Sequence, residues 1–301
     1  MLEETDMQRL NLVARSVLVS STMLCWSTVT RALEITAGDY EPLPVGMNAL
    51  LVYAQHAESS DFYSNGHKVS DDFRLKTDVS LLRYIHSFAL SNNAVIEPQF
   101  ILPYGHLKAG GEASALGQTT GAGDLILGAP VKWTLATANK DVFSVAPYLY
   151  LPTGSYENDD TLNLGENRWR LLLQAAYIHH FNARWALDTA ADVSWFSDND
   201  DYGSGSDTLE QKTRYEYQAY LSYNVSPQTR FAVGGGHIDG GENRVGGVNQ
   251  DDQLSTTYLR VSATHMLTPS IQVQAVLGRD VEVEEGFREK SRLNLRLAKL
   301  F

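Results

Sequence analysis

The sequence predicts an all-β chain that folds as a transmembrane, antiparallel, up-and-down β-barrel of the outer-membrane type with about twelve strands. Three observations predict this fold: period-two alternation over residues 47–301, connections that alternate between short and long, and a final strand that ends on an aromatic residue. In such a barrel every second side chain faces lipid, and the others face the lumen. The alternation therefore predicts a facing for each residue.

The final segment, residues 287–301, shows the alternation most clearly. Its apolar face carries Leu293, Leu295, Leu297 and Phe301. Its polar face carries Arg288, Lys290, Arg292, Asn294 and Arg296. A soluble sandwich could use the same pattern with its faces exchanged, so this strand predicts a membrane barrel only together with the rest of the chain.

Residues 1–32 are interpreted as a secretory signal peptide. Two arginines precede the mostly apolar stretch 16–26, and Thr30-Arg31-Ala32 offers a cleavage site between small residues. The first six residues are acidic, so translation is expected to begin at Met7. A retained anchor helix is the alternative, but the apolar stretch is shorter than a membrane span.

We expect residues 33–46 to form a short periplasmic segment and residues 47–301 to form the barrel. The formal net charge of −12 argues against nucleic-acid binding, which needs a basic surface. A mean hydropathy of −0.24 does not exclude a membrane barrel, because the lumen hides polar side chains.

About a dozen segments alternate in polarity with the length expected of membrane-crossing strands. The first, residues 47–56, alternates poorly, so its bounds are the least certain. The residues expected to face lipid in the other segments are Leu75, Thr77, Val79, Leu81; Ile96, Pro98, Phe100, Leu102; Leu125, Leu127, Ala129, Val131, Trp133, Leu135; Phe143, Val145, Pro147, Leu149, Leu151; Trp169, Leu171, Leu173, Ala175, Tyr177; Trp185, Leu187, Thr189, Ala191, Val193, Trp195; Tyr215, Tyr217, Ala219, Leu221, Tyr223; Phe231, Val233; Leu259, Val261, Ala263; and Ile271, Val273, Ala275, Leu277.

The connections between these segments alternate in length. Short turns are expected at residues 91–93, 137–140, 182–183, 226–228 and 268–270. Long polar loops are expected at residues 58–72, 105–123, 154–167, 197–212 and 239–252. Outer-membrane barrels have short turns on the periplasmic side and long loops outside, and an even strand count leaves both chain ends in the periplasm.

Aromatic residues mark the expected edges of the lipid-facing band. Trp185 and Trp195 share one face of a strand and lie ten residues apart. At about 3.3 Å per residue and a tilt near 40°, this separation is roughly 25 Å along the membrane normal. Trp169 and Tyr177 repeat the arrangement on the preceding strand. Such pairs are typical of aromatic girdles at the two interfaces.

The inward faces carry many ionisable groups, which are the candidate lumen-lining residues. These are Lys76, Asp78, Glu97, Asp124, Lys132, Arg168, Arg170, Asp188, Asp192, Glu216, Arg230, Arg260, Asp280, Arg288, Arg292 and Arg296. The simplest interpretation is a network of charges that neutralise one another. Alternatively, Arg288, Arg292, Arg296, Arg168 and Arg170 form a positive ladder for anionic solutes, or Tyr148, Tyr150 and Phe196 contact an aromatic solute.

Catalysis and metal binding were also considered. His179, His180 and His265 could serve a lipid hydrolase, but none has a serine or carboxylate at a spacing that identifies a triad. Glu157, Asp159, Asp160 and residues 198–201 supply oxygen ligands for calcium, without the spacing of an EF-hand. We therefore predict that the protein is not an enzyme and holds no metal or cofactor.

Several short motifs together resemble an outer-membrane family named for the MetA pathway of phenol degradation. They are Asp39-Tyr40, Pro44-Val45-Gly46, Gly121-Ala122-Gly123-Asp124-Leu125 and Leu151-Pro152-Thr153-Gly154. The resemblance implies a transporter-like outer-membrane barrel associated with the catabolism of aromatic compounds, and it supplies no catalytic residues. The glycines also have a plain structural interpretation, as sites where a loop enters or leaves a strand; they lack the spacing of a phosphate-binding loop.

Together these observations predict a channel in the outer membrane of a Gram-negative cell for passive uptake of small hydrophobic or aromatic molecules. The alternatives are a lipid-modifying hydrolase and a closed structural or surface-interaction barrel. The expected partners are outer-membrane lipid and lipopolysaccharide, the barrel-assembly machinery acting on the strand that ends at Phe301, and a small solute.

Overall fold

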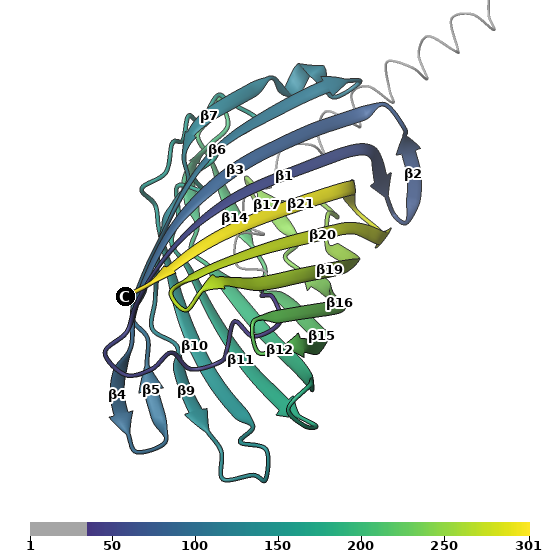
Figure 1. Cartoon of the computed structure of the whole chain (residues 1–301). Coiled ribbons are helices and arrows are strands. Elements are labelled where there is room, and N and C mark those ends of the chain that lie inside the picture. Colours follow the sequence, from purple (N-terminus) through teal and green to yellow (C-terminus); the bar gives the residue numbers. More distant parts are fainter. Residues whose placement is uncertain (1–34) are drawn as a thin grey trace, which may run out of the picture.

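The computed structural model describes residues 35–301, and the expected signal peptide, residues 1–32, lies outside them. The chain forms one closed antiparallel barrel of twelve strands (Figure 1). Neighbours around the wall follow chain order, and the barrel closes where β1 (Asn48–Ser64) pairs with β21 (Gly286–Leu300). The predicted fold is therefore confirmed. In the described part of the chain, no helix has the length and apolar character needed to span a membrane.

The wall between β1 and β21 consists of strands joined in sequence order. They are β3 (Phe73–His86), β6 (Gln99–Gly111), β8 (Leu125–Gly128), β10 (Val142–Leu151), β11 (Arg170–His180), β12 (Trp185–Phe196), β15 (Arg214–Ser226), β16 (Thr229–Gly240), β19 (Leu254–Thr268) and β20 (Ile271–Val283). On the side of the short turns, the wall is extended by β4 (Phe88–Ser91), β5 (Ala94–Ile96) and β9 (Val131–Thr134). Pro98 and Pro130 interrupt two of these strands because proline cannot donate to the ladder.

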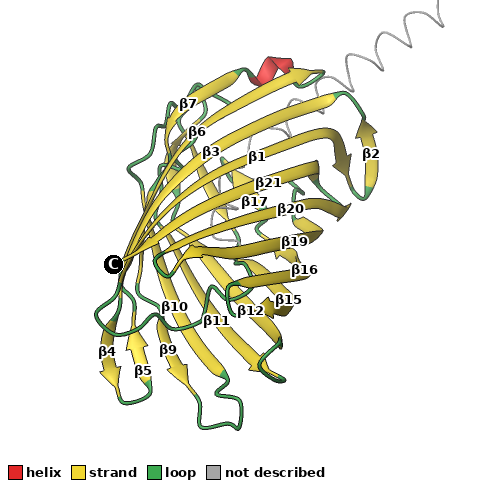
Figure 2. Cartoon of the chain, viewed as in Figure 1, coloured by secondary structure: helices red, strands yellow, loops and turns green. Residues whose placement is uncertain are grey.

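The expected long loops contain further structure. β2 (His67–Ser70) pairs with the end of β1, and β7 (Gln118–Ala122) follows the short 3₁₀ helix η2 (Ser114–Leu116) and pairs with β6. A separate small sheet joins two other loops (Figure 2). Its strands are β13 (Asn199–Tyr202), β14 (Asp207–Gln211), β17 (Asn243–Val245) and β18 (Val248–Asn249).

The lipid-facing side of β11 and β12 agrees with the predicted facing. Trp185 and Trp195 are both 42% exposed, and Leu171 and Leu173 are exposed on the neighbouring strand. The exposed residues of β12 alternate with buried ones, such as Asp188. On these two strands the apolar face points outward, as contact with hydrocarbon requires.

The predicted facing of β3 is wrong. Leu75, Val79 and Leu81 are buried inside the barrel, whereas the side chains of Lys76 and Asp78 are 57% and 56% exposed on the outside. Leu75 packs against apolar loop residues, whereas Val79 and Leu81 belong to the buried cluster that also contains Ile35 and Tyr40. The prediction assumed that the apolar face of β3 meets lipid along the whole strand. Because side chains alternate, assigning the wrong face to lipid gives the wrong side for every residue of the strand.

Two smaller expectations also change. The first strand runs to Ser64 instead of ending at His56, so most of the expected loop 58–72 is strand. An irregularity in the pairing of β1 with β21 near Ser59 alters the facing of the loop-side end of β21. Lys290 is consequently exposed, with its Nζ 3.3 Å from Asp61 Oδ1, instead of facing the lumen.

Candidate functional site

The strap, as we call residues 35–46, leads from inside the lumen to the turn before β1. Ile35, Ala37 and Tyr40 are buried in the same cluster as wall residues that include Leu81 and Tyr148. Over residues 35–43, the expected periplasmic segment 33–46 is thus packed inside the barrel, whereas residues 44–46 are exposed (Figure 1). Its alternation of apolar and polar residues was too short to predict this position.

A tight turn at Thr36–Glu41 places the strap in the centre of the lumen. Asp39 Oδ2 accepts a hydrogen bond from the Thr36 backbone N–H at 2.9 Å, and the Asp39 N–H donates to Thr36 O at 3.0 Å. Gly38 between them has a φ of +87°, which favours glycine. A Cβ at Gly38 would also lie 1.8 Å from Arg230 Nη1, so a larger residue would require the Arg230 guanidinium to move.

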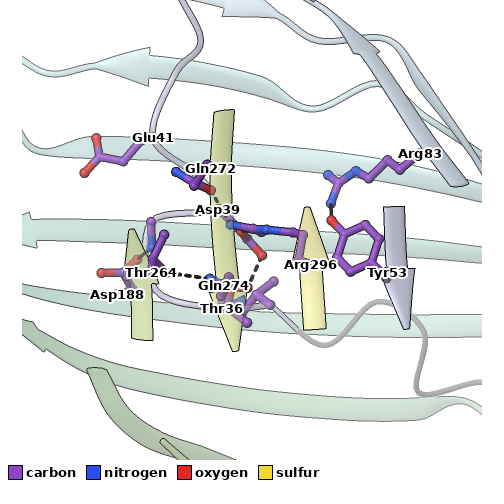
Figure 3. Close-up of polar contacts among 12 residues, drawn as sticks. Thr36, Asp39, Glu41, Tyr53, Arg83, Asp188, Thr264, Gln272, Gln274 and Arg296 are labelled. Atoms are coloured by element: carbon purple, nitrogen blue, oxygen red, sulfur yellow. Dashed lines mark hydrogen bonds and ion pairs between the residues drawn. The ribbon is translucent and has the colours of Figure 1, made fainter. Parts of the chain in front are cut away.

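Asp39 forms an ion pair with the wall. Arg296 Nη1 on β21 lies 2.7 Å from Asp39 Oδ1, and Arg296 Nη2 donates to Gln272 Oε1 at 2.8 Å (Figure 3). Burial alone would raise the pKa of Asp39, but the charges of Arg296 and Arg83 hold it below its ordinary value. Asp39 is therefore a carboxylate near neutral pH.

Lys132 and Glu97 hold the next part of the strap. Their side chains are only 5% and 2% exposed, and Lys132 Nζ lies 2.7 Å from Glu97 Oε2. Lys132 Nζ also donates to the backbone oxygens of Asp39 at 3.0 Å and Glu41 at 3.1 Å. Glu97 Oε1 accepts from the Leu43 N–H at 2.8 Å. One buried ion pair thus binds three strap residues.

Strands on the opposite wall complete the attachment. The Gly38 N–H donates to Asp188 Oδ2 at 2.6 Å, and the Tyr40 hydroxyl donates to Gln174 Oε1. His180 Nε2 lies 3.0 Å from Glu41 Oε1, and Arg230 Nη2 lies 3.6 Å from the same oxygen. Because these contacts come from widely separated strands, the strap is fixed across the lumen.

The strap separates two cavities. The smaller, about 50 Å³, is lined by residues that include Tyr53, Tyr148 and Gln274. The larger, about 260 Å³, extends to the short turn at Pro227 and to the end of β21 at Leu300. The side chains that line both cavities are Asp39, Arg83, Lys132 and Arg296. These four groups form the constriction between the two spaces.

Acidification should weaken this constriction. The folded-state pKa of Asp39 lies below its ordinary value, so the ion pair contributes fully above about pH 4 and is lost as the pH falls further. We expect the single-channel conductance in planar bilayers to rise as the pH is lowered from about 6 to about 3. Asp39→Asn should raise the conductance at neutral pH and remove this acid-dependent rise. A rise that persists unchanged in Asp39→Asn would assign it to another group.

The candidate lumen-lining residues fall into three groups: those that contact the strap, those elsewhere on the inner side, and those outside the barrel. Glu97, Lys132, Asp188, Arg230 and Arg296 contact the strap. The others found buried or half-buried on the inner side are Asp124, Arg168, Arg170, Asp192, Glu216, Arg260, Asp280 and Arg292. Arg288 lies between Phe287 and Glu289, which both face inward, so it points to the outer side, where it donates to the Tyr63 hydroxyl at 2.9 Å. Lys76 and Asp78 lie outside the barrel and do not line the lumen.

The proposed positive ladder contains acidic partners throughout. Arg292 Nη2 lies 2.6 Å from Glu289 Oε1, and Arg168 Nη2 lies 2.9 Å from Glu166 Oε2. Arg170 lies over the Tyr150 ring, with 4.4 Å from Cζ to the ring centroid. This arrangement favours a neutralised charge network over a continuous cationic path.

Two of the sequence motifs meet in space. The carboxylate of Asp124 accepts backbone N–H groups of Thr153 at 3.1 Å, Gly154 at 2.9 Å and Glu166 at 2.9 Å. A Cβ at Gly154 would lie 2.6 Å from the Gly165 Cα, so backbone approaches backbone here. Asp124 thus fixes the loop after β10 to the start of β8. The glycines have the structural role that the sequence suggested.

Sequence reasoning missed Asp39, Arg83 and the glutamines that contact the strap. Asp39 was placed in the periplasm, and Arg83 fell on the face of β3 assigned to lipid. The available signal for Asp39 was its place in the Asp39-Tyr40 motif. Within residues 35–301, no cluster of three or more His, Asp or Glu side chains is arranged to hold a metal ion.

Comparison with known proteins shows the family of the chain. The family model described as "Putative MetA-pathway of phenol degradation" matches residues 59–297. The chain belongs to this family. Among solved structures, the COG4313 outer membrane channel from Pseudomonas putida F1 is similar in family and fold. It shares 48% identity and a TM-score of 0.88, over 89% of this chain and 100% of that one.

More distant barrels share the fold alone. The β domain of the Bordetella autotransporter BrkA has a TM-score of 0.55 at 8% identity, covering 86% of this chain and 100% of that one. The translocator domain of the autotransporter NalP from Neisseria meningitidis has a TM-score of 0.53 at 10% identity, covering 90% and 94%. None of the curated proteins compared matches the sequence. Family and fold together locate this member in the Gram-negative outer membrane.

Proposed function

We propose that this protein is a passive uptake channel for small hydrophobic or aromatic molecules, in which the strap is the constriction. The observation that carries the proposal is the strap itself, which separates two cavities inside a barrel of a channel-containing family. The phenol pathway in the family description supports an aromatic solute. The solute would pass the four side chains Asp39, Arg83, Lys132 and Arg296.

The larger cavity suits a single-ring molecule. An apolar cavity of about 150 Å³ is enough to bind benzene, so a space of about 260 Å³ accommodates one ring and a space of about 50 Å³ does not. One side of the larger cavity is apolar, with Leu51, Ile85 and Ala298, whereas Arg230 lies on another side. This combination favours an aromatic ring that carries one polar group. Passage beyond the constriction requires the strap to move.

The remaining inward charges are proposed to line the path on the loop side. Tyr150 and Phe196 lie near Arg170 there and supply aromatic surface. We further propose that the strand ending at Phe301 is recognised by the barrel-assembly machinery, and that residues 1–32 direct export. These proposals rest on the sequence patterns described above.

Structural roles account for the histidines considered for catalysis. His179 Nδ1 lies 3.1 Å from Asp141 Oδ2, and His180 contacts the strap at Glu41. His265 Nδ1 lies 2.8 Å from the Thr229 hydroxyl on the exposed side of the wall. None of these contacts joins a histidine to a serine nucleophile. We therefore propose that the protein has no hydrolase activity.

The test is uptake by cells with and without this protein in their outer membrane. Radiolabelled phenol should enter faster when the protein is present, whereas a sugar of similar size should enter at the same rate. Equal phenol uptake in the two strains would overturn the proposal and favour the closed barrel. Release of fatty acids from membrane lipid that is lost in His179→Ala or His180→Ala would instead support the hydrolase.

A further inference from the structure

The outer surface carries a polar patch where the sequence predicted lumen. On β1 and β3 it comprises His56, Glu58, Lys76 and Asp78, and on β6 it continues with His106 and Lys108; we call these six residues the outer-wall patch. The same strand segments carry buried residues between them, including Leu75 and Leu107. β1, β3, β6 and β7 lie side by side on this part of the barrel (Figure 2).

The patch begins where the lipid-facing surface ends. The outward residues nearer the turns are apolar, with Val52 on β1, Leu82 on β3 and Leu102 on β6 all exposed. Toward the long loops, outward positions become charged at His56 and Asp78. Long loops of outer-membrane barrels lie outside the cell, so the patch lies at the level of the outer-leaflet headgroups. That leaflet consists of lipopolysaccharide, which carries phosphate groups at this height.

Strand register brings two lysines together. Lys76 on β3 stands directly opposite Lys108 on β6, and directly opposed side chains have Cβ atoms about 5 Å apart. Like charges in this relation destabilise a sheet unless an anion lies between them. The patch has room for such an anion, because both side chains are exposed to the outside.

Internal ion pairs leave one of the two lysines without a partner. Lys76 Nζ lies 2.8 Å from Glu58 Oε1, and His56 Nδ1 lies 2.6 Å from Asp78 Oδ1. Lys108 makes no ion pair or side-chain hydrogen bond with any residue in 35–301. His106, two residues before Lys108 on the same face of β6, has its Nδ1 2.6 Å from the Thr120 hydroxyl. The unpaired charge therefore lies next to a second cation and a histidine.

We propose that Lys76 and Lys108 bind a phosphate group of the lipopolysaccharide headgroup on the outer wall of the barrel. The two opposed lysines, one of them without an ion pair, and their height in the membrane select this partner. Each ammonium group would donate to a phosphate oxygen in a charge-assisted hydrogen bond. The site is independent of the solute path, because it lies on the opposite side of the wall from the lumen.

The test measures binding of lipid A to the detergent-purified protein by native mass spectrometry. Lipid A with both phosphates should bind about tenfold more tightly than dephosphorylated lipid A, as expected of one charge-assisted contact. The double variant Lys76→Gln/Lys108→Gln should lose this preference, whereas Lys76→Arg/Lys108→Arg should keep it. Raising the salt concentration should reduce the preference.

Lys299→Gln is the matched control. Lys299 is also an exposed lysine on the outer wall, but it lies at the turn side, where its Nζ donates to the Ser270 hydroxyl at 2.7 Å. This variant should bind lipid A as the wild type does. Unchanged binding by Lys76→Gln/Lys108→Gln would overturn the proposal. Complete displacement of lipid A by an equal concentration of inorganic phosphate would also overturn it, by showing a site for the free anion.

Discussion

Removing strap residues 35–41 should convert the barrel into an open pore with a several-fold higher single-channel conductance in planar bilayers. These residues include Asp39, which takes part in the constriction, and they separate cavities of about 50 and 260 Å³. Without them, the two cavities join and water fills the space between Arg83, Lys132 and Arg296. Uptake of a polar sugar into liposomes should rise in parallel.

Val45→Ser provides the control within the same segment. Val45 is exposed and lies beyond the residues that cross the lumen, so its replacement should leave the conductance unchanged. Heat-dependent gel mobility would establish that both variants form the barrel. A truncated protein with wild-type conductance would show that the loops, and not the strap, close the lumen.

Glu97→Gln should lower the free energy of unfolding by about 3–5 kcal/mol, because it leaves the Lys132 ammonium buried without its counter-ion. The pair is almost fully buried, with Lys132 Nζ 2.7 Å from Glu97 Oε2. The glutamine amide oxygen can still accept from the Leu43 N–H, so the cost comes from the lost charge. Guanidinium unfolding of the protein reconstituted in lipid vesicles measures this change.

Two further variants define the origin of the effect. Glu112→Gln removes an exposed carboxylate, and such surface changes usually alter stability by no more than about 0.5 kcal/mol. The double variant Glu97→Leu/Lys132→Met removes both buried charges and should recover most of the lost stability. If Glu97→Gln were as stable as Glu112→Gln, the ion pair would not hold the strap in place.

The sequence alone determined the barrel and the facing of most strands. Trp169, just before β11, and Trp185 and Trp195 on β12 face outward as predicted. The reason is physical: hydrocarbon tolerates apolar side chains only, so a strand in contact with lipid must show period two in its sequence. The motifs also indicated the family.

The loop-side half of β3 shows where this reasoning fails. Outside the hydrocarbon, the requirement for an apolar outer face disappears, and Leu75 and Val79 pack inward while Lys76 and Asp78 turn outward. Alternation fixes which residues share a face, but not which face is buried. That choice depends on what packs against the strand.

The strap is the feature that only the tertiary structure decided. Twelve residues before the first strand carry no periodicity that distinguishes a free segment from one inside the lumen. Their position depends on Glu97, Lys132, Asp188 and Arg296, which come from strands far apart in the sequence. Only closure of the barrel brings these buried groups together, and they need partners because an unpaired buried charge is costly.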